Sequence, residues 1–185
     1  PVHSSLGPVW VSTPNRLREA GFSVSNLPDH WDDDKIVPTF SRSEPLNLGW
    51  LMLQPTGRAN VSLPPNVNWG ETAQWEMASE KLVLVKPKLF SQIANSNLEV
   101  RTSVSIDPLT GAAKQGALFT YEALPRGTFL TMDLVLDDYR HDEAQRPFPV
   151  TETAEQNQLP NDGWAGPIDV VKAGLNMLAW LGVGG

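Results

Sequence analysis

The chain has 185 residues, a net charge of −7 and no cysteine. This length allows one domain with a sizeable core and is short for two. The absence of cysteine excludes disulfides and thiolate metal sites. The sequence contains no long apolar run and no N-terminal basic segment followed by an apolar one. We therefore expect a cytoplasmic protein that does not associate with a membrane.

The negative charge is concentrated in two segments. Residues 29–44 contain five acids and two bases, and residues 133–155 contain seven acids and two bases. A negative net charge argues against nucleic-acid binding, because phosphate contacts require Lys and Arg. We expect both acidic segments to be surface loops, and the nearly neutral remainder can still present a local basic face.

The first elements expected are a short strand over residues 9–12 and a helix that follows it. Thr13 is a suitable N-cap, and Pro14 suits the first helical position, where a missing N–H costs nothing. Gly21 suits the residue after the helix end. Arg16 and Arg18 lie on this helix, where they either face solvent or contact an RNA backbone.

Prolines interrupt the next part of the chain, so we expect mostly loops there. The apolar run at residues 46–53 predicts a strand. Residues 30–34, with one His and three Asp, are either a metal site or a solvated acidic loop. The loop is favoured, because consecutive Asp side chains point in different directions.

A buried strand and a helix are predicted for the following residues. The continuous apolar run at 82–85 is typical of a strand buried on both faces. Pro87 opens a helix that continues to Asn95, and its apolar residues fall on one face.

The strongest local pattern lies in residues 98–130. Apolar residues alternate with polar ones up to Ile106, which predicts a strand. Asp107, Pro108 and Gly111 then supply a turn: Asp bonds its own backbone, Pro presets φ and Gly accepts a positive φ. A second strand is expected from residue 113 to 121.

Three elements are expected after this hairpin. Residues 129–136 alternate enough to predict another strand. Residues 137–163 are polar, acidic and interrupted by proline, which is typical of a long surface loop. Pro167 begins a final helix, because apolar residues recur at helical spacing up to Gly182.

Three stretches of the sequence, in this order and spacing, match the pattern of a known family. The first contains Pro1, Val2, Ser4, Gly7, Val9, Trp10, Val11, Thr13, Pro14 and Leu17. The second contains residues 82–85, Phe90, Asn95 and Val100. The third contains Ile106, Asp107, Thr110, Gly111, Lys114, residues 116–119, Glu122, Leu124, Pro125 and Thr128.

Together these stretches resemble the RAMP-superfamily backbone subunits of type III CRISPR-Cas effector complexes, most of all the Cmr branch. The first resembles a strand-to-helix passage of that family, the second resembles the helix that leads into the family's thumb, and the third resembles the thumb and its return.

The resemblance implies an α+β fold. The expected arrangement is a ferredoxin-like or RRM-type antiparallel sheet with helices on one side and an inserted thumb β-hairpin. Residues 1–185 would form a single RAMP-type domain that lacks the family's first βαβ segment and last strand, and so would be a segment of a longer chain.

The resemblance also implies a function: a guide-RNA-binding backbone subunit that takes part in target RNA cleavage in antiviral defence. The implied partners are CRISPR guide RNA, target RNA and copies of the same or related backbone subunits. Because apolar residues are unusual at the tip of a turn, we expect the tip to wedge against nucleic acid or a neighbouring subunit. The residues expected to contact RNA are Arg16, Arg101, Pro108, Leu109, Lys114 and Arg126.

The residues of the chain do not make a self-sufficient active site, since the sequence contains no phosphate loop, HExxH, CxxC or nucleophile elbow. The resemblance assigns Tyr121 and Glu122 a supporting catalytic role near the scissile phosphate. Ala123 stands where a Tyr often stands in the family, and Glu122 has the alternative of an ion pair with Arg126. The chain would be part of a metal-dependent endoribonuclease whose catalytic Asp lies outside it. Mg²⁺ or another divalent ion would belong to the complete active site, with no metal bound by this chain alone.

A second hypothesis belongs to another class: a noncatalytic β-rich structural or protein-binding module, with the acidic loops as its protein or cation surface. RNA binding with a steep salt dependence would distinguish the first hypothesis from this one.

Overall fold

The computed structural model describes residues 1–63, 73–135 and 167–181. The chain divides into two compact units, Pro1–Thr131 and Met132–Gly185. Helix α4 (Pro167–Leu181) belongs to the second unit and starts at the proline that the sequence predicts. Whether residues 1–185 form a single domain stays a prediction.

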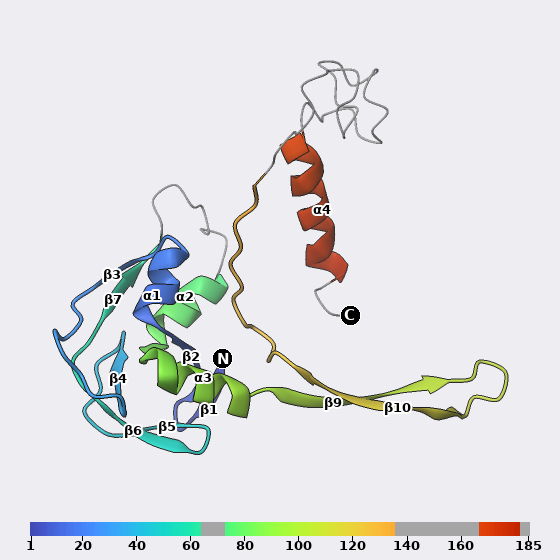
Figure 1. Cartoon of the computed structure of the whole chain (residues 1–185), viewed down its shortest axis with the longest axis horizontal. Coiled ribbons are helices and arrows are strands. Elements are labelled where there is room, and N and C mark those ends of the chain that lie inside the picture. The colour runs from blue at the N-terminus through green and yellow to red at the C-terminus, as the bar shows by residue number, and fades with distance from the viewer. Residues whose placement is uncertain (64–72, 136–166, 182–185) are drawn as a thin grey trace. The chain divides into compact units, whose positions relative to one another are not determined.

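The described part of the first unit contains ten strands and three helices (Figure 1). The strands are β1 (Val2–Ser4), β2 (Gly7–Ser12), β3 (Ser23–Ser25), β4 (Lys35–Pro38), β5 (Leu46–Leu48), β6 (Leu51–Pro55), β7 (Asn60–Ser62), β8 (Leu82–Leu84), β9 (Glu99–Ile106) and β10 (Ala113–Ala123). The helices are α1 (Pro14–Glu19), α2 (Ala73–Glu80) and α3 (Pro87–Ser96). The α+β class is confirmed.

The main sheet has six strands in the order β1-β2-β8-β4-β6-β5. Strands β2 and β8 are parallel, as are β4 and β6, whereas the other neighbours are antiparallel. The prediction of an antiparallel sheet is therefore wrong for this sheet. The physical reason lies in the connections between β2 and β8 and between β4 and β6. Each connection carries the chain back across the sheet, so that both strands of the pair start at the same end.

The two edges of this sheet approach each other. The Gly49 N–H donates to the His3 carbonyl at 2.9 Å, which joins the residue after β5 to edge strand β1. Gly49 has φ +64°, a left-handed conformation that a residue without Cβ adopts readily. The sheet is thus curled, and one of its faces is enclosed.

Each face of the sheet packs against a different set of elements. One core cluster contains Val83 and Ile36 from the sheet together with Leu89 and Ile93 from α3. The other contains Leu82, Leu84 and Val37, packed with side chains of α1, α2, β3 and β7. Because successive strand residues point to opposite faces, helices cover both faces, and the prediction of helices on one side is wrong. A central strand that is apolar throughout requires cover on both faces.

Local signals placed the starts of helices α1 and α3 correctly. The Thr13 hydroxyl accepts the Arg16 N–H at 3.2 Å and caps α1, whose first residue is Pro14. Helix α3 begins at Pro87 and buries Leu89 and Ile93 against the sheet, as their spacing predicts.

Three sequence expectations have other outcomes. The strand predicted over residues 129–136 is not formed at 129–135, because this extended segment pairs with no described strand. The apolar run at 46–53 is two strands, β5 and β6, because Gly49 turns the chain between them. The loop predicted at 137–163 lies outside the described residues. Among the described residues, no helix is long and apolar enough to cross a membrane.

A substitution series tests the two-sided burial of β8. Replacing Leu84 by Ala removes a fully buried side chain and should lower the free energy of unfolding by about 2–5 kcal/mol. Leu109→Ala, at a residue 94% exposed, should change it by less than about 0.5 kcal/mol. Urea unfolding followed by tryptophan fluorescence measures both, and similar midpoints for the two variants would contradict this packing.

Candidate nucleic-acid interface

Strands β9 and β10 form a two-stranded antiparallel hairpin that projects from the rest of the first unit (Figure 1). The predicted turn joins them: the Asp107 carboxylate accepts the Leu109 N–H at 2.9 Å, and Gly111 has φ +67°. A side chain at Gly111 would meet open space beyond its two neighbours in the chain. The turn therefore stands clear of the core, with Pro108 and Leu109 exposed at its tip.

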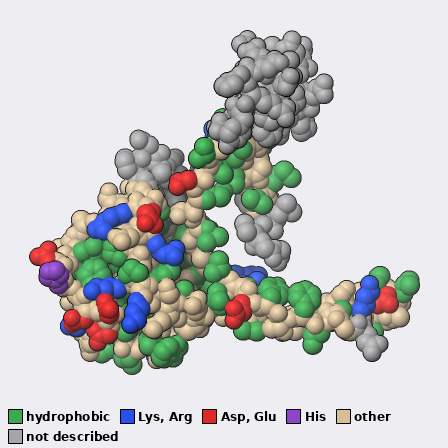
Figure 2. All heavy atoms as spheres, viewed as in Figure 1, with side chains coloured by type: hydrophobic (Ala, Val, Ile, Leu, Met, Phe, Trp, Pro, Cys, Tyr) green, Lys and Arg blue, Asp and Glu red, His purple; other side chains and the backbone are tan. Residues whose placement is uncertain are grey.

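One face of the hairpin is aliphatic. Residues directly paired across an antiparallel ladder share a face, and Val104 pairs with Leu118. Ile106 and Val100 lie on the same face, two and four residues from Val104. All four side chains are exposed, Leu118 at 68%. Figure 2 shows apolar side chains along the hairpin.

The opposite face is aromatic and polar. The rings of Phe119 and Tyr121 stack with centroids 5.9 Å apart and an interplanar angle of 27°. Tyr121 pairs across the ladder with Arg101, and Phe119 is 57% exposed. This face combines planar rings with a guanidinium, the groups on which nucleobases stack in single-stranded RNA recognition.

Arg101 is held by an acid on its own strand. Its Nη2 lies 2.7 Å from the Glu99 Oε2. The hydrogen bond from Arg101 keeps the pKa of Glu99 below its ordinary value, and the backbone N–H and charge of Arg126 add to this effect. The hydrogen bond to Glu99 in turn raises the pKa of Arg101. The pair is exposed, so solvent screens it and it stabilises the fold little.

The structure brings most predicted RNA-contacting residues onto one element. Arg101, Pro108, Leu109 and Lys114 belong to the hairpin, with Lys114 exposed near the tip. Arg126 lies at the base, beside Glu99. Arg16 is elsewhere in the same unit: its guanidinium lies over the Phe90 ring, 4.7 Å from the centroid.

Tyr121 and Glu122 point to opposite faces of the hairpin, because they are adjacent in a strand. Glu122 pairs with Val100 on the aliphatic face, and Tyr121 lies opposite Arg101. The alternative ion pair between Glu122 and Arg126 is not formed among the described residues, where Arg126 instead approaches Glu99. A supporting catalytic role for either side chain stays a prediction.

The acidic loop before β4 is paired with lysines. Asp32 lies 2.7 Å from the Lys35 Nζ, and Asp33 lies 3.2 Å from the Lys86 Nζ. In the described part of the chain, no three His, Asp or Glu side chains converge as a metal site would require. Whether residues 30–34 are a solvated loop or a metal site stays a prediction.

A bulge in β10 hid the aromatic face from the sequence pattern. In an unbroken ladder Val104 would pair with residue 115, but it pairs with Leu118, a shift of three residues. An odd shift moves every later side chain to the other face. Gly116, at φ +75°, is the signal that could have located this bulge.

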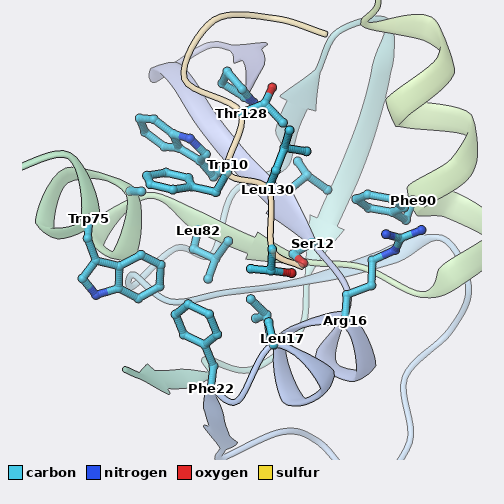
Figure 3. Close-up of a pocket in the computed structure, with 16 residues that line it drawn as sticks. Trp10, Ser12, Arg16, Leu17, Phe22, Trp75, Leu82, Phe90, Thr128 and Leu130 are labelled. Carbon is cyan, nitrogen blue, oxygen red and sulfur yellow. The ribbon is translucent and has the colours of Figure 1, made fainter. Parts of the chain in front are cut away.

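The chain that returns from the hairpin is fastened to the sheet beside a pocket. Trp10 Nε1–H donates to the Gly127 carbonyl at 2.8 Å. Phe129 packs near Trp10 and Trp75, with ring centroids 6.3 and 6.2 Å away. The three rings and side chains of α1 line a pocket of about 260 Å³ (Figure 3). The sequence did not reveal this pocket, because its walls come from distant segments.

The sequence was compared with known families and proteins. A family model described as "RAMP superfamily" matches residues 5–185, which is nearly the whole chain. No curated protein matches the sequence.

Proposed function

The chain belongs to the RAMP superfamily, whose members take part in CRISPR-associated RNA-binding complexes, and we propose that it is a guide-RNA-binding backbone subunit of a type III effector complex of the Cmr branch. Its partners in this proposal are guide RNA, target RNA and copies of the same or related backbone subunits, in the cytoplasm. The observation that carries the proposal is the projecting hairpin, whose apolar tip no other described residue covers.

The hairpin is built to contact something outside its own unit. An isolated two-stranded hairpin is at best marginally stable in water, and this one exposes apolar side chains on both faces. Exposed apolar patches of this kind mark interaction sites. We assign the aromatic face and the tip to RNA, because planar rings and Arg101 suit unstacked bases and phosphates.

The covered sheet also supports the hairpin as the RNA-binding element. In an RRM, RNA stacks on an open face of the sheet, whereas both faces are covered here. Proteins of this superfamily have ferredoxin-like folds, and we infer that the curled, mixed sheet is a modified form of that fold. In this form RNA contact falls to the hairpin.

Target RNA cleavage is the second part of the proposal. The catalytic Asp would lie outside this chain, and Mg²⁺ or another divalent ion would supply charge stabilisation in the complete active site. The described residues do not fit such an ion by themselves, since no acidic group converges and Tyr121 and Glu122 diverge. The contribution of Tyr121 and Glu122 would be limited to positioning RNA.

A noncatalytic structural or protein-binding module remains the second candidate. The aliphatic face of the hairpin supports it, because Val100, Val104, Ile106 and Leu118 offer a patch suited to a protein partner. A backbone subunit that stacks against its copies would use such a face as well.

Removing hairpin cations should weaken RNA binding without changing sequence preference. Arg101→Ala, Lys114→Ala and Arg126→Ala should each lower affinity for single-stranded RNA and reduce the salt slope by about one unit per lost phosphate contact. Lys88→Ala removes the same charge from α3 and should leave the slope unchanged. Fluorescence anisotropy at several salt concentrations measures this, and unchanged binding in all three hairpin variants would refute the guide-holding role.

Freeing Arg101 from its intramolecular acid should strengthen RNA binding. Glu99→Gln removes the carboxylate that competes with phosphate, and affinity should rise about two- to fivefold, the scale of an exposed ion pair. Glu122→Gln removes the same charge from the opposite face and should have a smaller effect. Equal gains in both variants would show that only net charge matters.

Residues 1–185 by themselves should leave RNA uncut in the presence of Mg²⁺, whereas the complete assembly should cut at regular intervals. Repeated subunits repeat their active site, so subunit spacing alone sets the cut spacing. Gel analysis of labelled RNA measures both. Cleavage by residues 1–185 that is lost in Glu122→Gln or Tyr121→Phe would place the chemistry within this chain, against the proposal.

A further inference from the structure

We propose that the pocket between β2, α1 and the return segment 128–131 binds one nucleotide unit, with the base against its aromatic walls and the phosphate on Arg16. The choice of a nucleotide rests on the proposed RNA-binding function, and the site itself rests on the pocket. It is separate from the hairpin, none of whose residues line it.

The walls suit a single planar ring. Five aromatic side chains line the pocket: Trp10, Phe22, Trp75, Phe90 and Phe129. Several are held by one another, as in the tilted contact of Phe22 with Trp75 at 4.9 Å. At about 260 Å³ the pocket is slightly below the roughly 300–1,000 Å³ typical of drug-sized ligands. Its size therefore fits one base better than two stacked ones.

The charge of the pocket selects an anion. Of the described residues that line it, Arg16 alone has a charged side chain, although the whole chain carries −7. Among the described residues, no acid pairs with Arg16, and its guanidinium contacts the Phe90 ring. An exposed guanidinium on an aromatic face retains N–H donors for a phosphate.

The pocket has an aromatic end and a charged end. Figure 3 shows Trp10, Trp75 and Phe22 on one side of the pocket, and Arg16 and Phe90 on the other. Trp10 Nε1–H and the Thr128 hydroxyl already donate to the Gly127 and Pro125 carbonyls, so they shape the wall. Ser12 also lines the pocket, where its hydroxyl can bond a ribose. A nucleotide carries its base and its phosphate at opposite ends, as this layout requires.

Calorimetric titration of residues 1–185 with adenosine 5′-monophosphate tests the site. The wild-type chain should bind it, and Arg16→Ala should weaken binding about tenfold or more, as expected for a lost hydrogen bond to a charged group. Arg18→Ala is the matched control: Arg18 lies on the same helix, its Nη1 donates to Asn15 at 3.4 Å, and it does not line the pocket. No binding, or equal loss in both variants, would overturn the proposal.

A second variant and a second probe test the base end. Phe129→Leu keeps an apolar wall but removes a ring, and should weaken nucleotide binding about fivefold or more if the base stacks there. Inorganic phosphate should compete poorly. Competition by phosphate as strong as that of unlabelled nucleotide, together with unchanged binding in Phe129→Leu, would reduce the pocket to a simple anion site and refute the proposal.

Single-stranded RNA distinguishes the source of the nucleotide. If Arg16→Ala also weakens RNA binding and the mononucleotide competes with RNA, the ligand is a unit of the strand. If RNA binding is unchanged while mononucleotide binding falls, the ligand is a free nucleotide. If the chain binds RNA and no mononucleotide, this site is refuted and the proposed function stands. If the chain binds the mononucleotide and no RNA, this site stands and the proposed function is refuted.

Discussion

The burial of strand β8 on both faces is the constraint on which the rest of the first unit depends. Its side chains are almost completely buried, and they alternate between two separate core clusters. Both faces must therefore be covered, which α3 does on one side and α1, α2 and the β3–β7 pair do on the other. At roughly 1.5–3 kcal/mol for each fully buried aliphatic side chain, this strand and its neighbours outweigh any surface ion pair in the chain. The parallel pairing of β8 with β2 is compatible with this packing, because the long connection between these strands carries α1 and α2 onto one face of the sheet.

A sheet with no free face leaves recognition to what projects from it. The hairpin extends directly from the end of α3, and its return is fastened by the bond between Trp10 and Gly127. This anchor places the return segment over the aromatic pocket, so the hairpin and the pocket share one piece of chain. An RNA strand that contacts the hairpin base would thus pass near a second, differently built site. The two proposed sites differ in their groups: the hairpin has exposed rings and cations, and the pocket has an apolar wall with one cationic side chain.

The distribution of charge along this acidic chain is compatible with the RNA binding that we propose. Asp32 and Asp33 are paired with lysines on the body, and the hairpin cations lie far from them in sequence. Glu99 is the acid that pairs with Arg101 of the proposed interface, and Arg101 holds the pKa of Glu99 below its ordinary value. Glu99 therefore stays ionised and keeps Arg101 oriented at neutral pH, and the pair separates when pH falls through that lowered pKa. An exposed pair of this kind orients a side chain more than it stabilises the fold.

The sequence by itself determined what depends on neighbouring residues. Thr13 and Pro14 start α1, Pro87 starts α3, and Asp107 with Gly111 makes the turn, because caps and turns are fixed by a few consecutive residues. The tertiary structure decided what depends on distant pairs: the parallel strands, the cover on both faces, and the pocket assembled from β2, α1, α2 and the return segment. It also decided which face of β10 each side chain occupies, since the bulge before Leu118 shifts the ladder by an odd number of residues. Alternation along a strand shows that two faces differ, but only the register with the partner strand shows which residues share them.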